Sequence, residues 1–145
     1  MTEVTFHFNV PDPLAYVCRL VRRATGTGKK VVVTGGGPLL QRLDEELWTF
    51  SPADFIPHCH AASADPQVLQ ASPVVLADQA RGAPHQDVLV NLGGGVPDGF
   101  EKFERLNEIV SQDDADRQQA RLRWKHYASR GYAIRKYDAV TREST

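Results

Sequence analysis

Alternation of apolar and polar residues opens the chain and then gives way to a helical spacing. Residues 2–10 place apolar side chains at every second position, which predicts a β-strand with one buried face. Asp12 and Pro13 then suit the N-cap and the first turn of a helix. Beyond them apolar residues recur at i, i+3, i+4 and i+7, as on the core-facing side of a helix. These residues are Leu14, Val17, Cys18 and Val21.

Short uninterrupted apolar runs follow, and they predict strands that are covered on both faces. The runs are residues 30–34 (KVVVT), 74–77 (VVLA) and 87–92 (DVLVNL). Between the first two, three leucines predict a helix with one buried side, and residues 55–59 predict a further short strand. The leucines are Leu40, Leu43 and Leu47.

Two helices are predicted after the third run. The first follows the glycines at 93–95 and turns four apolar residues inward: Phe100, Phe103, Leu106 and Val110. The second begins near Asp113, which can cap it, and runs to about Arg130 before Gly131. Residues 132–137 then predict a last strand.

Strands that alternate with amphipathic helices are typical of an α/β fold with a largely parallel sheet and helices on both faces. We therefore expect one Rossmann-like domain over residues 1–138 and a flexible C-terminal tail over residues 139–145. The length of 145 residues, with 41% hydrophobic and 24% charged residues, is ordinary for a globular domain.

The N-terminal residues and the lengths of the apolar segments predict where in the cell the protein is found. The first ten residues have no basic stretch followed by an apolar one, so we expect no signal peptide. No apolar run approaches the roughly 20 residues that span a bilayer, so we expect no membrane contact. The two cysteines, Cys18 and Cys59, are then interpreted as free thiols in a cytoplasmic protein.

Two motifs invite a chemical interpretation, and neither has the required spacing. The Gly35–Gly37 turn follows a strand, but a dinucleotide-binding fingerprint needs a third glycine where Leu40 stands. His58-Cys59-His60 offers two imidazoles, yet no second cluster at zinc-site spacing accompanies it. Adjacent strand residues also point to opposite faces, which makes Cys59 a poor nucleophile candidate beside a histidine. We expect no catalytic residue, no cofactor and no metal.

Charge is strongly segregated in spite of a net charge of -1. Residues 115–137 hold seven basic residues and one acid, whereas the rest of the chain holds ten basic and seventeen acidic residues. At 100° per residue, five side chains of the last helix fall within about a third of its circumference. They are Arg117, Arg121, Trp124, Lys125 and Ala128. Guanidinium groups beside an indole would suit an acidic peptide with a hydrophobic end and a free carboxylate. A solvated helix face is the alternative.

Three segments together resemble the chi subunit family of bacterial DNA polymerase III. They are LDEELWTF (residues 43–50), SPADFIPH (51–58) and RLRWKHYASRGY (121–132), and the resemblance extends over nearly the whole chain. It implies a Rossmann-like accessory subunit without catalysis that pairs with the psi subunit of the clamp-loader assembly. It also implies binding of the acidic C-terminal tail of single-stranded-DNA-binding protein, so that single-stranded DNA is contacted only indirectly.

The resemblance also assigns residues to two surfaces by position. The surface for the tail would comprise Val110, Arg117, Arg121, Trp124, Lys125, Tyr127 and Gly131. The surface for psi would comprise Trp48, Phe55 and Pro57.

Two alternative functions stay open at this point. One is direct binding of single-stranded nucleic acid, with Trp124, Tyr127 and Tyr132 as stacking platforms. The other is a nucleotide-dependent enzyme that uses the Gly35–Gly37 turn.

Overall fold

A computed structural model describes residues 1–49 and 56–143. The described residues form a seven-stranded sheet in the order β3-β4-β2-β5-β6-β1-β7, and every pair of neighbours is parallel. The strands are β1 Glu3–Val10, β2 Val31–Thr34, β3 His58–His60, β4 Val74–Ala77, β5 Val88–Asn91, β6 Arg105–Ser111 and β7 Ile134–Asp138. The helices are α1 Pro13–Gly26, α2 Gly37–Thr49, α3 Pro66–Ala71, the 3-10 turn η1 Phe100–Lys102 and α4 Asp114–Ser129.

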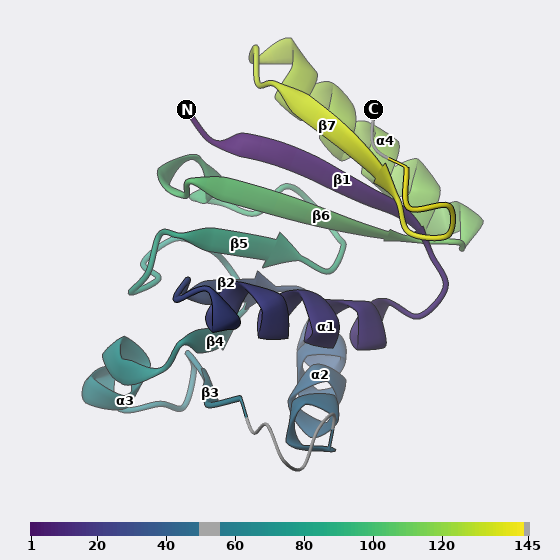
Figure 1. Ribbon diagram of the computed structural model, residues 1–145. Coiled ribbons are helices and arrows are strands. Elements are labelled where there is room, and N and C mark those ends of the chain that lie inside the picture. The colour runs from purple at the N-terminus through teal and green to yellow at the C-terminus, as the bar shows by residue number, and fades with distance from the viewer. Residues whose placement is uncertain (50–55, 144–145) are drawn as a thin grey trace.

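The sheet divides the core into two layers. Val31 and Val33 of β2 pack with the buried faces of α1 and α2, whereas Val32 packs on the opposite side with Ala120 and Tyr127 of α4. Figure 1 shows α1 in front of the sheet and α4 behind β1 and β7. Because each face is covered, β2, β4 and β5 are buried along their whole length. The predicted fold, an α/β domain with helices on both faces, is confirmed.

Helix α1 begins and packs as its sequence predicts. The Asp12 carboxylate accepts a hydrogen bond from the backbone N–H of Ala15 at 3.2 Å, and Pro13 stands in the first turn. The four predicted residues are the buried ones: Leu14, Val17, Cys18 and Val21. Burial raises the pKa of the Cys18 thiol to about 11.

The helix predicted after the glycines at 93–95 is wrong. Only η1 is helical, and Arg105–Ser111 forms β6 in the middle of the sheet, between β5 and β1. The strand period is present, because Leu106, Glu108 and Val110 all point toward α4. A charged residue at the central buried position conceals this alternation, so the apolar residues that remain fall at helical spacing.

Smaller differences concern the ends of elements. The third strand comprises His58–His60, whereas the prediction began at Phe55, which lies outside the described residues. The last strand comprises Ile134–Asp138, so it begins two residues later and ends one residue later than predicted. The short helix α3 was not predicted. Residues 139–143 make backbone hydrogen bonds to Phe8 and Asp138, and the domain boundary at residue 138 stays a prediction.

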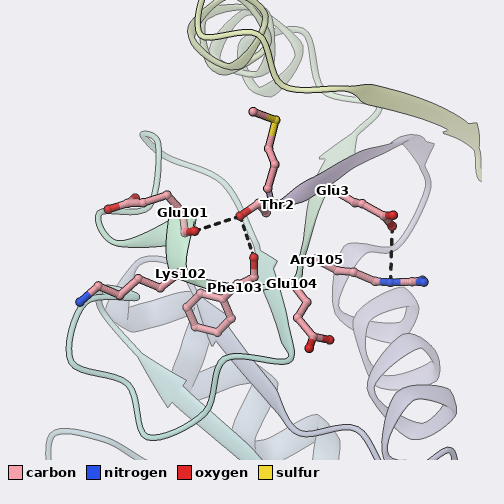
Figure 2. Close-up of a pocket in the computed structure, with 8 residues that line it drawn as sticks. Thr2, Glu3, Glu101, Lys102, Phe103, Glu104 and Arg105 are labelled. Carbon is pink, nitrogen blue, oxygen red and sulfur yellow. Dashed lines mark hydrogen bonds and ion pairs between the residues drawn. The ribbon is translucent and has the colours of Figure 1, made fainter.

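The beginning of β1 is held by the loop that contains η1. The Thr2 hydroxyl donates a hydrogen bond to the carbonyl oxygen of Phe103 at 2.6 Å, and the carbonyl oxygen of Glu101 lies 3.3 Å away. Glu3 and Arg105, on neighbouring strands, approach to 3.7 Å (Figure 2). The residues concerned line a polar hollow of about 480 Å³, and Glu3 and Arg105 are register partners of β1 and β6.

No helix among residues 1–49 and 56–143 has the length and apolar character needed to cross a membrane.

Candidate functional site

Helix α4 is the element that carries most of the predicted site. Asp113 caps it by accepting a hydrogen bond from the Asp116 N–H, and Asp116 in turn accepts one from the Ser111 N–H at 2.8 Å. These bonds join the helix to the end of β6, and the two acidic side chains suit the positive end of the helix dipole. Gly131, at φ +80°, follows the last turn as predicted.

A groove of about 580 Å³ lies between α4 and the sheet, and we call it the α4 groove. It contains four of the predicted residues: Val110, Arg117, Arg121 and Trp124. It also contains five residues that sequence reasoning did not assign to the site: Phe6, Phe8 and Asn9 of the β1 strand, Ala120 of α4 and Lys136 of β7. The alternation of β1 indicates that Phe6 and Phe8 share a face, but only the strand order places that face beside α4.

The α4 groove combines an apolar floor with cations on two walls. The rings of Phe6 and Trp124 lie 5.0 Å apart between centroids and are tilted by 53°. Arg121 of α4 and Lys136 of β7 both line the groove, and the Lys136 ammonium lies 5.2 Å from the centre of the Trp124 ring. Within the described part of the chain, no carboxylate forms an ion pair with either of these two cations. The groove can therefore accept an apolar side chain and negative charge together.

Beneath α4 lies a buried polar network centred on Glu108. Its carboxylate accepts hydrogen bonds from Nε of Arg123 at 2.9 Å, from the Asn91 amide at 2.9 Å and from the Tyr127 hydroxyl. A second nitrogen of Arg123 donates to the carbonyl oxygen of Gly94 at 2.8 Å. Burial raises the pKa of Glu108, and the adjacent guanidinium opposes that shift. The network joins α4 to β5, to β6 and to the loop after β5.

This network corrects part of the charge argument. Arg123 was counted in the basic segment, yet it is only 1% exposed and is neutralised by Glu108. Tyr127, assigned to the tail surface, is fully buried under the helix. A buried ring cannot stack on a base, so the proposed platform of Trp124, Tyr127 and Tyr132 is not formed. The exposed basic face of α4 is smaller than the sequence indicates.

The remaining residues of the predicted tail surface lie outside the α4 groove. Lys125 is exposed on α4, and Gly131 stands at the end of the helix. Tyr132, beyond Gly131, is half-buried against the ring of Phe100.

The second predicted surface surrounds the end of α2. Trp48 is 59% exposed, and its ring lies 5.4 Å from that of His58 on β3. Pro57 is exposed beside that strand, whereas Phe55 lies outside the described residues. Nε2 of His58 lies 2.8 Å from Oδ1 of Asp44, which ties β3 to α2 and fixes the ring that Trp48 contacts.

The two motifs set aside earlier occupy defined places. His58 and His60 both face Asp44, at 2.8 Å and 3.7 Å, and the described residues contain no group of three or more potential ligands placed to hold a metal. In the glycine turn, a Cβ at Gly35 would lie 3.2 Å from Leu92, whereas Gly36 and Gly37 face open space. The close approach of Leu92, which follows β5, therefore explains why a glycine stands at position 35, but it does not explain Gly36 or Gly37.

Residues 1–135 match the family model described as DNA polymerase III chi subunit, HolC. The chain belongs to the chi subunit family. It is 33% identical over 140 residues to DNA polymerase III subunit chi of Pseudomonas aeruginosa, which covers 92% of this chain and 94% of that protein. The chi subunit of Escherichia coli is 30% identical over 120 residues, covering 81% of this chain and 80% of that protein. The chi subunit of Haemophilus influenzae is 29% identical over 119 residues, covering 81% of each.

The family membership confirms the resemblance found in the sequence. The chain is a chi subunit of the DNA polymerase III complex, an accessory subunit of DNA replication.

Proposed function

We propose that the chain is a non-catalytic adaptor that links the clamp loader to single-stranded-DNA-binding protein. It pairs with the psi subunit on the surface around Trp48, Phe55 and Pro57. It binds the acidic C-terminal tail of single-stranded-DNA-binding protein in the α4 groove. The proposal rests on one groove that combines an apolar floor with cations from α4 and β7, where Arg121 and Lys136 form no ion pair with any carboxylate of the described residues.

The α4 groove suits a tail that ends in Pro-Phe with a free carboxylate. The terminal ring would pack on the partly exposed side chains of Phe8 and Trp124, above the buried ring of Phe6. The terminal carboxylate and the acidic residues before it would meet Arg117 and Arg121, whose guanidinium groups can each bind a carboxylate through two hydrogen bonds. Lys136 would add a third cation from the opposite wall. Lys125 and Gly131 would act only if the tail extends beyond the groove.

A calorimetric titration with an acidic peptide ending in Pro-Phe tests the assignment. We expect Arg121→Ala and Trp124→Ala each to weaken binding by about 1–3 kcal/mol, as for anchor residues of other interfaces. Arg42→Ala is the matched control, because it removes an exposed helical arginine far from the groove. Unchanged affinity in both groove variants would contradict the site.

A second peptide, identical except for an amidated C-terminus, identifies which cation of the α4 groove binds the terminal carboxylate of the tail. If Arg121 holds that group, the amide weakens binding to the wild type but not to Arg121→Ala. An equal loss in both proteins would move the carboxylate to Arg117 or Lys136.

The psi surface is tested by co-purification with psi. Trp48 offers the largest exposed apolar side chain near the end of α2, and anchor residues of interfaces are enriched in tryptophan. We expect Trp48→Ala to weaken the pair by about 2 kcal/mol or more. The same variant should keep wild-type affinity for the tail peptide, because the α4 groove lies at the opposite end of the sheet. A pair that survives Trp48→Ala unchanged would refute the assignment.

A further inference from the structure

The face of the sheet that carries α1 is left open over β1 and β7. Figure 1 shows α1 lying in front of the lower strands, while none of the described helices covers the front of these two. Val4, Phe6 and Phe8 point toward α4, so the alternate residues of β1 and their partners on β7 line the open face. They are Thr5, His7, Arg135 and Tyr137. A groove of about 470 Å³ runs between this face and the C-terminal half of α1.

Arg23 and Arg135 are two exposed arginines that line this groove, and the exposed Arg19 stands near it. Arg23 of α1 and Arg135 of β7 line it from two sides, and Arg19 lies one helical turn before Arg23, 5.9 Å from the centre of the Tyr16 ring. No carboxylate in the described ranges forms an ion pair with any of the three. Arg23 is also near enough to His7 to help lower the pKa of that imidazole, although burial contributes more.

Acidic side chains are confined to one end of the groove. Glu3 and Glu104 line that end, where they pair with Arg105 at 3.7 Å and Lys29 at 3.8 Å. Both pairs are more than half exposed, so they are weak and open to exchange with other anions. Asp87 accepts a hydrogen bond from the Lys30 N–H at the same end. Four basic and three acidic residues thus line the groove, and among the described residues neither Arg23 nor Arg135 forms an ion pair with those carboxylates.

Aromatic rings lie beside these arginines, with Tyr16 one turn before Arg19 on α1 and Tyr137 two residues after Arg135 on β7. The His7 ring stands 5.4 Å from Tyr16 and 5.7 Å from Tyr137, edge to face in both cases. Tyr16 and Tyr137 are each half-buried, which leaves part of each ring accessible. The hydrogen bond from His7 to the Asn107 side chain at 2.9 Å holds the central ring in place. We call Arg19, Arg23, Arg135, Tyr16 and Tyr137 the arginine face.

We propose that the arginine face binds single-stranded nucleic acid directly. Guanidinium groups on both sides of a groove can follow a phosphate backbone, and partly exposed rings beside them can stack on unpaired bases without reading their sequence. An acidic peptide with an apolar anchor fits less well, because the floor of this groove is polar, with Thr5, His7 and Asn107. The α4 groove, with its phenylalanine floor, has the opposite character.

This site is independent of the proposed tail binding. It lies on the other face of the sheet and shares no residue with the α4 groove. In a protein that holds the tail with α4, the arginine face would contact the exposed strand itself.

Fluorescence anisotropy with a labelled oligothymidine of 20 nucleotides tests the proposal, with the full chain at low salt and no other protein. We expect weak binding that falls with salt, with a slope of log K against log[salt] of about −2 for three phosphate contacts on a single strand. The double variant Arg23→Ala/Arg135→Ala should weaken binding about tenfold and reduce the slope by about 1.4.

Two controls decide what a loss of binding means. Arg42→Ala/Arg81→Ala removes the same charge from exposed positions elsewhere and should stay within about twofold of the wild type. Arg121→Ala should also stay near the wild type for the oligonucleotide, while it loses the tail peptide. The arginine face is refuted if the wild type shows no change in anisotropy at millimolar protein. It is equally refuted if the control pair loses as much affinity as the double variant, or if Arg121→Ala abolishes oligonucleotide binding.

Discussion

Replacing Arg123 by methionine tests how far the network under α4 determines the stability of the domain. The substitution keeps much of the side-chain volume but removes the charge that neutralises Glu108, whose carboxylate is fully buried. Removal of one partner of a buried ion pair costs about 3–5 kcal/mol, because the other charge is left without compensation. Small domains have a free energy of unfolding of about 5–15 kcal/mol, so the loss is a large fraction of the total.

The double variant Glu108→Leu/Arg123→Met separates the charge effect from packing. It removes both charges and leaves the Tyr127 hydroxyl without its acceptor, which costs about 1–3 kcal/mol. The Asn91 amide loses the same carboxylate but keeps the carbonyl oxygen of Gly95 at 3.3 Å as an acceptor. We therefore expect the double variant to be more stable than Arg123→Met alone, although it carries one more substitution. Urea unfolding followed by circular dichroism and tryptophan fluorescence gives both free energies.

Two outcomes would refute this reasoning. One is a loss below about 1 kcal/mol in Arg123→Met, which would mean that Glu108 is protonated or reached by water in that variant. The other is a double variant whose loss equals the sum of the losses measured for Arg123→Met and for Glu108→Leu alone, which would mean that the two side chains act independently. The network also holds α4 to the sheet, so we expect a destabilised Arg123→Met to lose affinity for the tail peptide at temperatures where it remains folded.

Three further predictions concern other parts of the fold. Nε2 of His7 donates a hydrogen bond to the Asn107 side-chain oxygen, and burial lowers the pKa of the His7 imidazole. As the pH falls below about 6.5, His7 is therefore protonated in the unfolded chain before it is protonated in the folded one. The free energy of unfolding of the wild type should then fall relative to His7→Gln by up to about 1.4 kcal/mol per pH unit. Asp12→Ala removes the N-cap of α1 and should cost about 0.5–2 kcal/mol in urea unfolding. Gly99→Ala should cost about 1–3 kcal/mol, because Gly99 has φ +91° and a Cβ there would lie 2.9 Å from the Arg81 backbone.

Each of these three has an outcome that contradicts it. Parallel stability curves for the wild type and His7→Gln between pH 7 and 5 would mean that His7 is accessible to protons when folded. For the cap, Asp12→Asn should restore most of the loss, since an amide oxygen accepts the same bond. Gly82→Ala is the control for Gly99, because it shares a positive φ but its Cβ meets open space, so it should cost less. An equal cost at both glycines would show that backbone strain alone decides the effect.

Several features of the molecule could be predicted from the sequence because they depend on local chemistry. Residues within one or two turns of each feature are enough to predict it. This holds for the cap and buried face of α1, for the buried strand β2 and for Asp113 as the N-cap of α4. The conjunction of Arg117, Arg121 and Trp124 on one helix face is likewise a matter of spacing alone. Helical geometry makes these residues neighbours whatever the rest of the chain does.

Only the tertiary structure decided which distant residues contact this face of α4. Phe6 is more than a hundred residues from Trp124, and the strand order alone makes it the floor of the groove. Arg123 has the same charge as Arg121 in the sequence, yet one is buried on Glu108 and the other faces solvent, because α4 packs with that side against β6. The same buried carboxylate, Glu108, interrupts the apolar alternation of β6, which is why the sequence pattern did not predict that strand. A charge in the core is stable only with its partner, and a local pattern does not show which distant residue provides that partner.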